Sequence, residues 1–373
     1  MFKNFFDTKL SLNDISIVPC VTTNIKSREE CNPYIIPYIH NFETLPLFTA
    51  PMSTVVGEEN IDLFYANKIE PILPRNFDFD IRIKKLNEGY WCAFGLSDIE
   101  HILKNNIIEK IQYPKILIDV ANGHMNIIYE LSIHIRKQNK NSIIMVGNIA
   151  NPETYITCCE HKINYVRLGI GGGSGCLTAT NIGVFYPIVD LIDEINTIKK
   201  TTIRPNTFKT KIIADGCARN YSDIIKALAL GADRVMCGKL FAQMLETPGE
   251  IKAKYKNGMS SFIVNRNEDE YRNTSDSYPF KDLENNPITL TKEFYGMASK
   301  RGQEDFCVPR LKTAEGKVET IEIKYSMRQW VENFTDYLRS AMSYTGKRDI
   351  EDFIGGVNII KLSENASNSF NKW

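Results

Sequence analysis

The sequence carries no net charge, because its 45 lysine and arginine residues balance its 45 aspartate and glutamate residues. A balanced chain has no general attraction to nucleic acid or to an anionic membrane. No apolar run approaches the roughly 18 residues of a membrane span, and the opening MFKNFFDTKLSLND is too polar for a signal peptide. We therefore expect a cytoplasmic protein without nucleic-acid or membrane partners. Any charged ligand is expected to bind at a site formed by a few local residues.

Cysteine and histidine spacings typical of zinc sites are also missing. The nine cysteines are scattered, with no C-x-x-C pair and no paired histidines. In a reducing compartment these residues are predicted to be free thiols, most of them small buried apolar side chains. Cys176 is the exception, because it directly follows the glycine-rich stretch LGIGGGSG.

Short apolar runs alternate with segments that have helical spacing, such as 126–138 and 221–232. Strands that are apolar nearly throughout indicate a parallel sheet covered by helices on both faces. Eight such units predict an α/β fold, a (β/α)8 TIM barrel, with an open doubly wound sheet as the alternative. The predicted strands are residues 46–51, 70–74, 90–95, 115–120, 142–148, 165–170, 211–216 and 234–238.

Two segments exceed a minimal barrel. Residues 171–187 form an extended loop before the sixth helix, and residues 247–325 are polar and irregular, which suggests a flap over the barrel. A helix is predicted at 327–344, and the tail 364–373 is predicted to be disordered. We expect residues 1–373 to form a single catalytic domain.

Three successive predicted strands end in glycine. Strand six is followed by GGGSGC, strand seven ends at Asp215 and Gly216, and strand eight ends at Gly238. In barrels of this kind the chemistry lies at the carboxyl ends of the strands, and glycines let backbone N–H groups approach an anion. We predict a phosphomonoester site there. Asp215 is either a helix cap or a partner for ribose hydroxyls, and Cys176 is a nucleophile facing the ring of the same ligand.

Several of these motifs, in this order, resemble the IMP dehydrogenase and GMP reductase family of (β/α)8 enzymes. The resemblance covers about residues 8–346, and its motifs are IDVANGH, GGGSGCLTA, IIADG, GADRVMCGKLFAQMLETPGE and FYGMAS. No inserted regulatory domain separates PILPRN from WCAFG, and IDVANGH is closer to the reductase form. The segment between FYGMAS and AEGK is short and holds no Arg-Tyr pair of the dehydrogenase type. These features favour GMP reductase.

The resemblance implies a reaction and a set of residues. GMP would be converted to IMP and ammonia with NADPH, through a covalent thioimidate on Cys176. Thr178 and Glu315 would handle the proton of the departing amine. Further matched positions are Ser174, Gly216, Gly238 and Tyr295 for the phosphate, Asp215 for the ribose, and Gly296 and Met297 for the purine edge.

The resemblance also implies a cofactor site, an ion and an assembly. Asp119, Ser340 and Tyr344 match cofactor contacts, the last two reaching the cofactor from a neighbouring subunit of a homotetramer. Carbonyl groups of Gly171, Gly173 and Cys176 are expected to hold a potassium ion, as in relatives. The choice between NADPH and NADH stays open, because the side chains that meet the 2′-phosphate cannot be placed from sequence.

Departures from the family pattern surround the thiol. Ala179 stands where an arginine is usual, Leu177 where a threonine is usual and Ser53 where an aspartate is usual, while Cys217 replaces a glycine and Lys312 lies near a usual arginine. The catalytic trio is kept and its surroundings are altered. The alternatives are therefore the same chemistry on a deoxy- or modified guanine nucleotide, an IMP dehydrogenase without its regulatory domain, or a silent nucleotide-binding relative.

Overall fold

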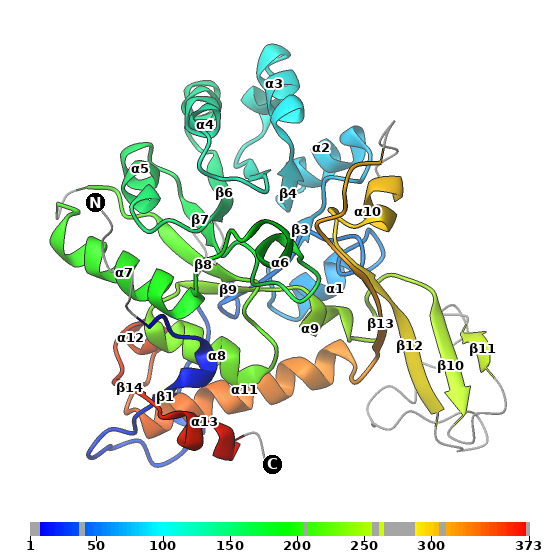
Figure 1. Ribbon diagram of the computed structural model, residues 1–373. Helices are drawn as coiled ribbons and strands as arrows, with labels where there is room; N and C mark the ends of the chain where they lie inside the picture. Colours follow the sequence, from blue (N-terminus) through cyan, green and yellow to red (C-terminus); the bar gives the residue numbers. More distant parts are fainter. Residues whose placement is uncertain are drawn as a thin grey trace.

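The computed structural model describes residues 8–36, 42–204, 207–255, 261–264, 288–305 and 311–370. Its centre is a parallel sheet of eight strands in the order β2-β9-β8-β7-β6-β5-β4-β3. Hydrogen bonds from Thr49 N to Glu70 O (3.1 Å) and from Glu70 N to Leu47 O (3.3 Å) join the first strand to the chain leading into the second. The sheet therefore closes, and the predicted TIM barrel is confirmed (Figure 1).

Each predicted strand is present, shifted or shortened by a few residues at most. The strands are β2 (Leu47–Thr49), β3 (Ile72–Leu73), β4 (Trp91–Phe94), β5 (Lys115–Asp119), β6 (Ile143–Ile149), β7 (Tyr165–Leu168), β8 (Lys211–Asp215) and β9 (Arg234–Cys237). The helices around them are α1 (Ile61–Ala66), α2 (Phe79–Asn87), α3 (Leu96–Lys104), α4 (Asn126–Gln138), α5 (Thr154–Glu160), α7 (Ile188–Thr201), α8 (Tyr221–Leu230), α9 (Lys239–Ala242) and α11 (Met327–Tyr344). The helix predicted at 327–344 is confirmed residue for residue.

Large side chains fill the barrel interior. Phe48, Trp91 and Tyr165 meet edge to face, with ring centroids 5.7 to 5.8 Å apart. Glu70 accepts a hydrogen bond from Trp91 Nε1 (2.7 Å) and pairs with Arg234 (3.3 Å), and both charged groups are almost fully buried. The barrel is thus a packed core, and the chemistry must lie at one end of it.

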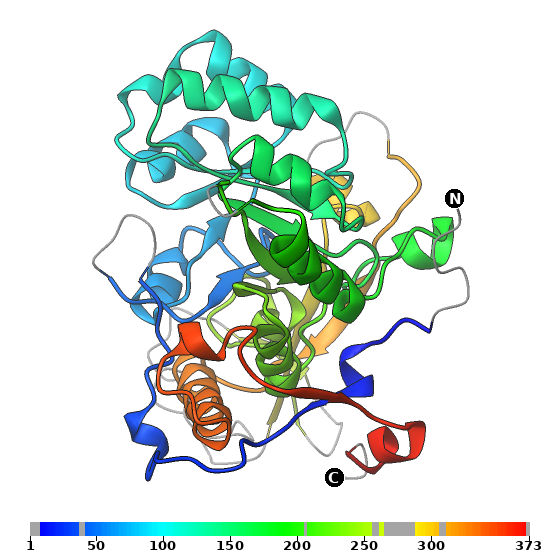
Figure 2. The same ribbon diagram turned by 90° about the vertical axis from the view of Figure 1, so that its left-hand side faces the viewer.

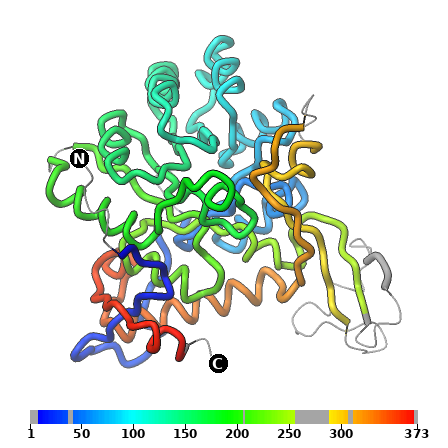
Figure 3. Tube along the Cα trace, in the orientation of Figure 1, coloured from blue at the N-terminus to red at the C-terminus, as the bar shows by residue number. Residues whose placement is uncertain are grey.

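A second, antiparallel sheet extends from the barrel beside α9 (Figure 3). Its order is β11-β10-β12-β13, formed by β10 (Ile251–Tyr255), β11 (Ser261–Val264), β12 (Ile288–Tyr295) and β13 (Val318–Glu322), with α10 (Lys300–Asp305) between the last two. The expectation of an irregular segment at 247–325 is therefore wrong for the described residues. Buried and more exposed side chains alternate along β12, as expected for a strand with one buried face, although one buried position is Lys292. The stretch NRNEDEYRNTSDSYP at 265–279 lies outside the described residues.

The two ends of the described chain meet on one side of the barrel (Figure 2). Here β1 (Ile15–Ile17) pairs antiparallel with β14 (Ile359–Lys361), near the short helices η1 (Leu12–Asp14) and α12 (Ile350–Phe353). The remaining 3-10 helices are η2 (Arg28–Glu30) and η3 (Ile107–Lys110). No helix in the described part of the chain is long and apolar enough to cross a membrane.

The prediction of a disordered tail is wrong for residues 364–370, whereas the loop predicted at 171–187 is present before α7 with a short helix inside it. Residues 364–370 of the tail form helix α13 (Glu364–Phe370), because Ser367 is buried and its hydroxyl donates a hydrogen bond to Asn13 O (2.7 Å). The predicted loop at 171–187 contains a short helix, α6 (Thr178–Ile182), which ends at Gly183 in a left-handed conformation.

Candidate active site

The loop after β7 presents the thiol of Cys176 in a tight turn. Cys176 N donates a hydrogen bond to Gly173 O (2.9 Å), and the side chain is only partly buried. Gly171 has a φ of +79°, a conformation that side-chain-bearing residues rarely adopt. The glycine run therefore shapes the loop, and helix α6 starts two residues after the thiol.

Cys176, Thr178 and Glu315 form one hydrogen-bonded chain. Cys176 Sγ donates to Thr178 Oγ1 (3.2 Å), which donates to Glu315 Oε2 (3.0 Å) across a sequence separation of 137 residues. Backbone hydrogen bonds hold the two segments together, from Leu177 N to Glu315 O (2.7 Å) and from Lys317 N to Gly175 O (3.0 Å). A nucleophile, a hydroxyl and a carboxylate are thus joined by two successive hydrogen bonds. This arrangement can move a proton between sulfur and carboxylate.

The glycines predicted to bind phosphate lie at neighbouring strand ends. Gly216 has a φ of +74°, and a Cβ there would come within 2.8 Å of Gly173 N, so the loops after β7 and β8 pack backbone to backbone. A Cβ on Gly238 would lie 3.3 Å from Met52 Sδ, and one on Gly296 would lie 3.7 Å from Met52 Cε. Met52, which sequence reasoning missed, therefore lies between two of the predicted substrate contacts.

The segment from Tyr295 to Met297 begins at the last residue of β12 and adjoins the segment that carries Glu315. Glu315 N donates to Ala298 O (3.0 Å), so this loop contacts the Glu315 segment. The Tyr295 hydroxyl donates to Asp305 Oδ2 (2.8 Å). Burial, together with the Asp305 charge, raises the pKa of Tyr295, and the phenol stays protonated as a donor. Ser174, in the Cys176 loop, is exposed.

A buried arginine that sequence reasoning missed fixes the two aspartates. Arg167 on β7 pairs with Asp119 Oδ1 (2.6 Å) and Asp215 Oδ2 (2.9 Å). Asn148 Nδ2 also donates to Asp215 Oδ2 (2.8 Å), and Arg75 Nε lies 3.9 Å from Asp119 Oδ2. Although burial lowers the pKa of Arg167, the two carboxylates outweigh it and hold the pKa above its usual value. A charged residue inside the apolar strand YVRL was the available signal, because it needs buried partners.

Ser340 and Tyr344 lie in another part of the molecule. Both belong to α11, which packs beside α8 and η2 through an apolar stripe that includes Trp330, Phe334 and Leu338. The Tyr344 side chain is 67% exposed. The structure thus brings the predicted catalytic trio together but leaves these two predicted cofactor residues on an outer helix.

Cys217, directly after Gly216, differs chemically from Cys176. Burial and the nearby Asp215 and Asp223 raise the pKa of Cys217 to about 12. It is therefore a protonated thiol at neutral pH, whereas Cys176 alone has the Thr178–Glu315 chain among the described cysteines.

Comparison with known proteins gives the family. A model described as IMP dehydrogenase / GMP reductase domain matches residues 92–370. The chain belongs to this family. It is 28% identical over 347 residues to a GMP reductase of Staphylococcus epidermidis, covering 91% of this chain and 92% of the relative. It is also 27% identical over 354 residues to the GMP reductase of Bacillus subtilis, covering 92% of each, and 28% identical over 349 residues to that of Mesoplasma florum, covering 91% and 93%.

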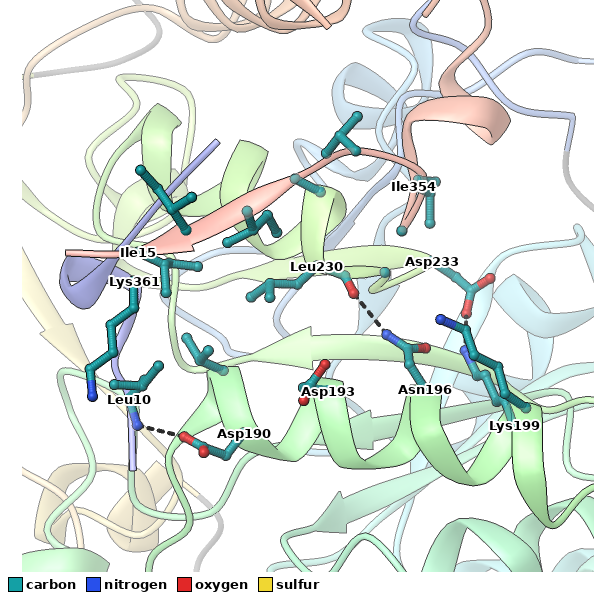
Figure 4. A pocket seen from close by; sticks show the side chains of 18 residues that line it. Leu10, Ile15, Asp190, Asp193, Asn196, Lys199, Leu230, Asp233, Ile354 and Lys361 are labelled. Atoms are coloured by element: carbon teal, nitrogen blue, oxygen red, sulfur yellow. Dashed lines mark hydrogen bonds and ion pairs between the residues drawn. The ribbon is translucent and has the colours of Figure 1, made fainter. Parts of the chain in front are cut away.

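A separate hollow of about 530 Å³ lies between α7 and the C-terminal segment around β14 (Figure 4). Asp193, Asn196 and Lys199 line it from α7, opposite apolar side chains such as Leu230 and Ile354. None of the residues that the family pattern assigns to substrate or cofactor lines this hollow. It is therefore distinct from the Cys176 site.

Proposed function

We propose that this chain is a GMP reductase, which converts GMP to IMP and ammonia with NADPH through a covalent bond between Cys176 and the purine. The observation that carries the proposal is the hydrogen-bonded chain Cys176–Thr178–Glu315 in a barrel of this family. The names of the GMP reductase relatives support the reductase direction.

The residues divide the chemistry among them. Cys176 Sγ adds to C2 of the guanine ring, and the thiol proton passes through Thr178 and Glu315 to the exocyclic amine. The C2–N bond then breaks and ammonia leaves, giving the thioimidate. NADPH, when bound, supplies the hydride that replaces sulfur at C2. A proton taken up from solvent then reaches the released thiolate through Glu315 and Thr178, which restores the thiol.

Substrate recognition is assigned to the strand ends around the thiol. Ser174, Gly216, Gly238 and Tyr295 would bind the phosphate, and Asp215, oriented by Arg167, would accept hydrogen bonds from the ribose hydroxyls. The purine edge would be read by Gly296 and Met297, next to the Glu315 segment.

The described residues fit a nicotinamide cofactor in one respect. Asp119 is buried at the end of β5, and its Oδ2 has no hydrogen-bond partner, so an acceptor remains for a donor group of the cofactor. Ser340 and Tyr344 would contribute from a neighbouring subunit of a tetramer. A potassium ion would be held by the carbonyls of Gly171, Gly173 and Cys176.

The direct test is incubation with GMP and NADPH, measuring nicotinamide oxidation together with released ammonia. We expect both products in equal amounts. Oxidation of IMP with NAD⁺, without ammonia release from GMP, would instead identify a dehydrogenase, and absence of both reactions would identify a silent relative.

A second candidate keeps this chemistry but changes the nucleotide, and Ala179 favours it. A Cβ on Gly171 would lie 2.8 Å from Ala179 Cβ, so Ala179 lies directly against the glycine loop that carries the thiol. A small side chain offers the ligand no cation where the family usually has an arginine. A panel of GMP, dGMP and XMP compared by kcat/KM tests this candidate, and a preference for GMP of a thousandfold or more, on the scale set by a hydrogen-bonded group, would contradict it.

A further inference from the structure

Lys239 lies beside the proposed phosphate site but has not been given a role. It directly follows Gly238 as the first residue of α9, and its side chain is 33% exposed. Its ammonium group pairs with Glu319 Oε2 on β13, which runs next to α9 (Figure 1). Lys239 therefore links a barrel strand end to the second sheet.

Glu319 is shared between two lysines. Its other carboxylate oxygen, Oε1, pairs with Lys317, which follows the Glu315 segment. Burial alone would raise the pKa of Glu319, but hydrogen bonds from both lysines outweigh it and hold the pKa below its usual value. The carboxylate is ionised, and it keeps a cationic partner if one lysine leaves.

The strand register places this charge cluster at the proposed phosphate site. Glu319 pairs with Phe294 across β13 and β12, and the Phe294 ring lies 3.3 Å from the position that a Cβ on Gly175 would take, so this face of β13 is turned toward the Cys176 loop. Lys239 directly follows Gly238, the N-cap of α9. The cluster thus adjoins Gly238 and the loop that carries Ser174, two of the groups that we assign to the phosphate.

The proposed phosphate contacts carry no charge of their own. They are a serine hydroxyl, two glycine backbones and a phenol. Near Tyr295, Arg301 pairs with Asp305 (3.7 Å), and these opposite charges offset each other. The lysine pair with Glu319 has a net charge of +1, since two cations surround one carboxylate. A phosphate dianion that is partly removed from water needs a cationic partner.

We propose that Lys239 binds the 5′-phosphate of the nucleotide, turning its ammonium group from Glu319 to the phosphate while Lys317 stays on Glu319. This inference rests on the proposed function, since it assumes a nucleotide at the glycine strand ends. Lys239 is then a substrate-binding residue that selects nucleotides over nucleosides. Glu319 is the group with which the phosphate competes.

Binding measurements without cofactor test the exchange. Isothermal titration with IMP and with inosine is compared for the wild type, Lys239→Met and Glu319→Gln. We expect Lys239→Met to weaken IMP binding roughly tenfold to a hundredfold, the effect of one charge-assisted hydrogen bond, with inosine binding unchanged. Glu319→Gln should tighten IMP binding, because Lys239 no longer has to leave a carboxylate.

Because the two variants are expected to change IMP affinity in opposite directions, the experiment distinguishes phosphate binding by Lys239 from a purely structural ion pair. If the Lys239–Glu319 pair only joins the two sheets, both variants lose IMP and inosine affinity together, which overturns the inference. Lys252→Met is the matched control, because Lys252 forms an exposed pair with Glu250 (3.6 Å) on β10, and it should change neither affinity. Equal IMP affinity in Lys239→Met and the wild type also overturns the inference but leaves the proposed function intact. Failure of the wild type to bind IMP or GMP overturns the proposed function itself.

Discussion

Arg167 shows at the scale of one residue how the barrel orients its polar groups. It is 7% exposed and holds Asp119 at the end of β5 and Asp215 at the end of β8. Removing one partner of a buried ion pair leaves uncompensated charge, which costs much more than the loss of an exposed pair. The orientation of Asp215 toward a ribose therefore depends on an arginine that need not touch the substrate.

We predict that Arg167→Met lowers the free energy of unfolding by about 3 to 5 kcal/mol, because two carboxylates are left buried together. Arg301→Met is the control, since its pairs with Glu304 and Asp305 are exposed and worth about 1 kcal/mol or less. Denaturant unfolding of both variants measures the difference. Similar losses in the two variants would contradict the role of burial.

Cys176→Ala should abolish turnover and leave nucleotide binding largely intact. The thiol acts only in the covalent step, whereas the proposed phosphate and ribose contacts, apart from Ser174, come from other strand ends. Steady-state assays and IMP titration measure the two properties separately, and quenched wild-type enzyme should show a nucleotide adduct by mass spectrometry. Cys217→Ala is the control thiol, and wild-type activity in Cys176→Ala would exclude the mechanism.

Glu315→Gln should lower kcat about a hundredfold to ten-thousandfold, the contribution of one acid–base group, with little change in GMP affinity. The amide still accepts the Thr178 hydrogen bond but cannot carry the proton. Single-turnover release of ammonia measures the step directly. If only KM rises, Glu315 is a binding residue and the proton path through Thr178 is wrong.

At the scale of the element, α11 is held by aromatic packing against the barrel. Trp330 is fully buried, stacks on Phe334 (5.2 Å between centroids) and meets Phe241 edge to face (4.9 Å). This helix also carries Ser340 and Tyr344 on its last turns. Its attachment therefore fixes where the proposed cofactor residues are presented.

Trp330→Ala should lower the free energy of unfolding by about 3 to 5 kcal/mol, because a large cavity replaces an aromatic core residue. Glu332→Ala, at an exposed position of the same helix, should change it by about 0.5 kcal/mol or less. Thermal or chemical unfolding followed by circular dichroism compares the two. A small loss in Trp330→Ala would mean that α11 contributes little to the stability of the barrel.

At the scale of the whole molecule, the proposed cofactor site requires a second subunit. Tyr344 is exposed, whereas its backbone oxygen is held by a hydrogen bond from Cys20 N (3.0 Å), so most of the residue's surface faces solvent. We predict a tetramer by light scattering. Tyr344→Ala should raise the KM for NADPH without changing the affinity for IMP or the stability of the chain, and an unchanged KM would remove Tyr344 from the cofactor site.

The sequence by itself determined the elements of the barrel. The eight barrel strands and α11 were predictable because apolar runs and helical spacing are local properties of the chain. Motifs predicted the trio Cys176, Thr178 and Glu315, together with Asp119 and Asp215. Each of these residues lies at the end of a predicted strand or in a motif of the family.

Only the tertiary structure decided which groups meet. Glu315 reaches Thr178 across 137 residues because backbone hydrogen bonds join two loops, and no local pattern encodes such a pairing. The sequence shows Arg167 only as one residue of a predicted strand, and the structure shows that it pairs with Asp119 and Asp215. Likewise, the polar tail forms α13 because Ser367 finds a buried acceptor on Asn13, 354 residues earlier in the chain. The stability of these polar groups depends on contacts between segments that are far apart in the chain. A local sequence pattern does not show which distant segments come into contact.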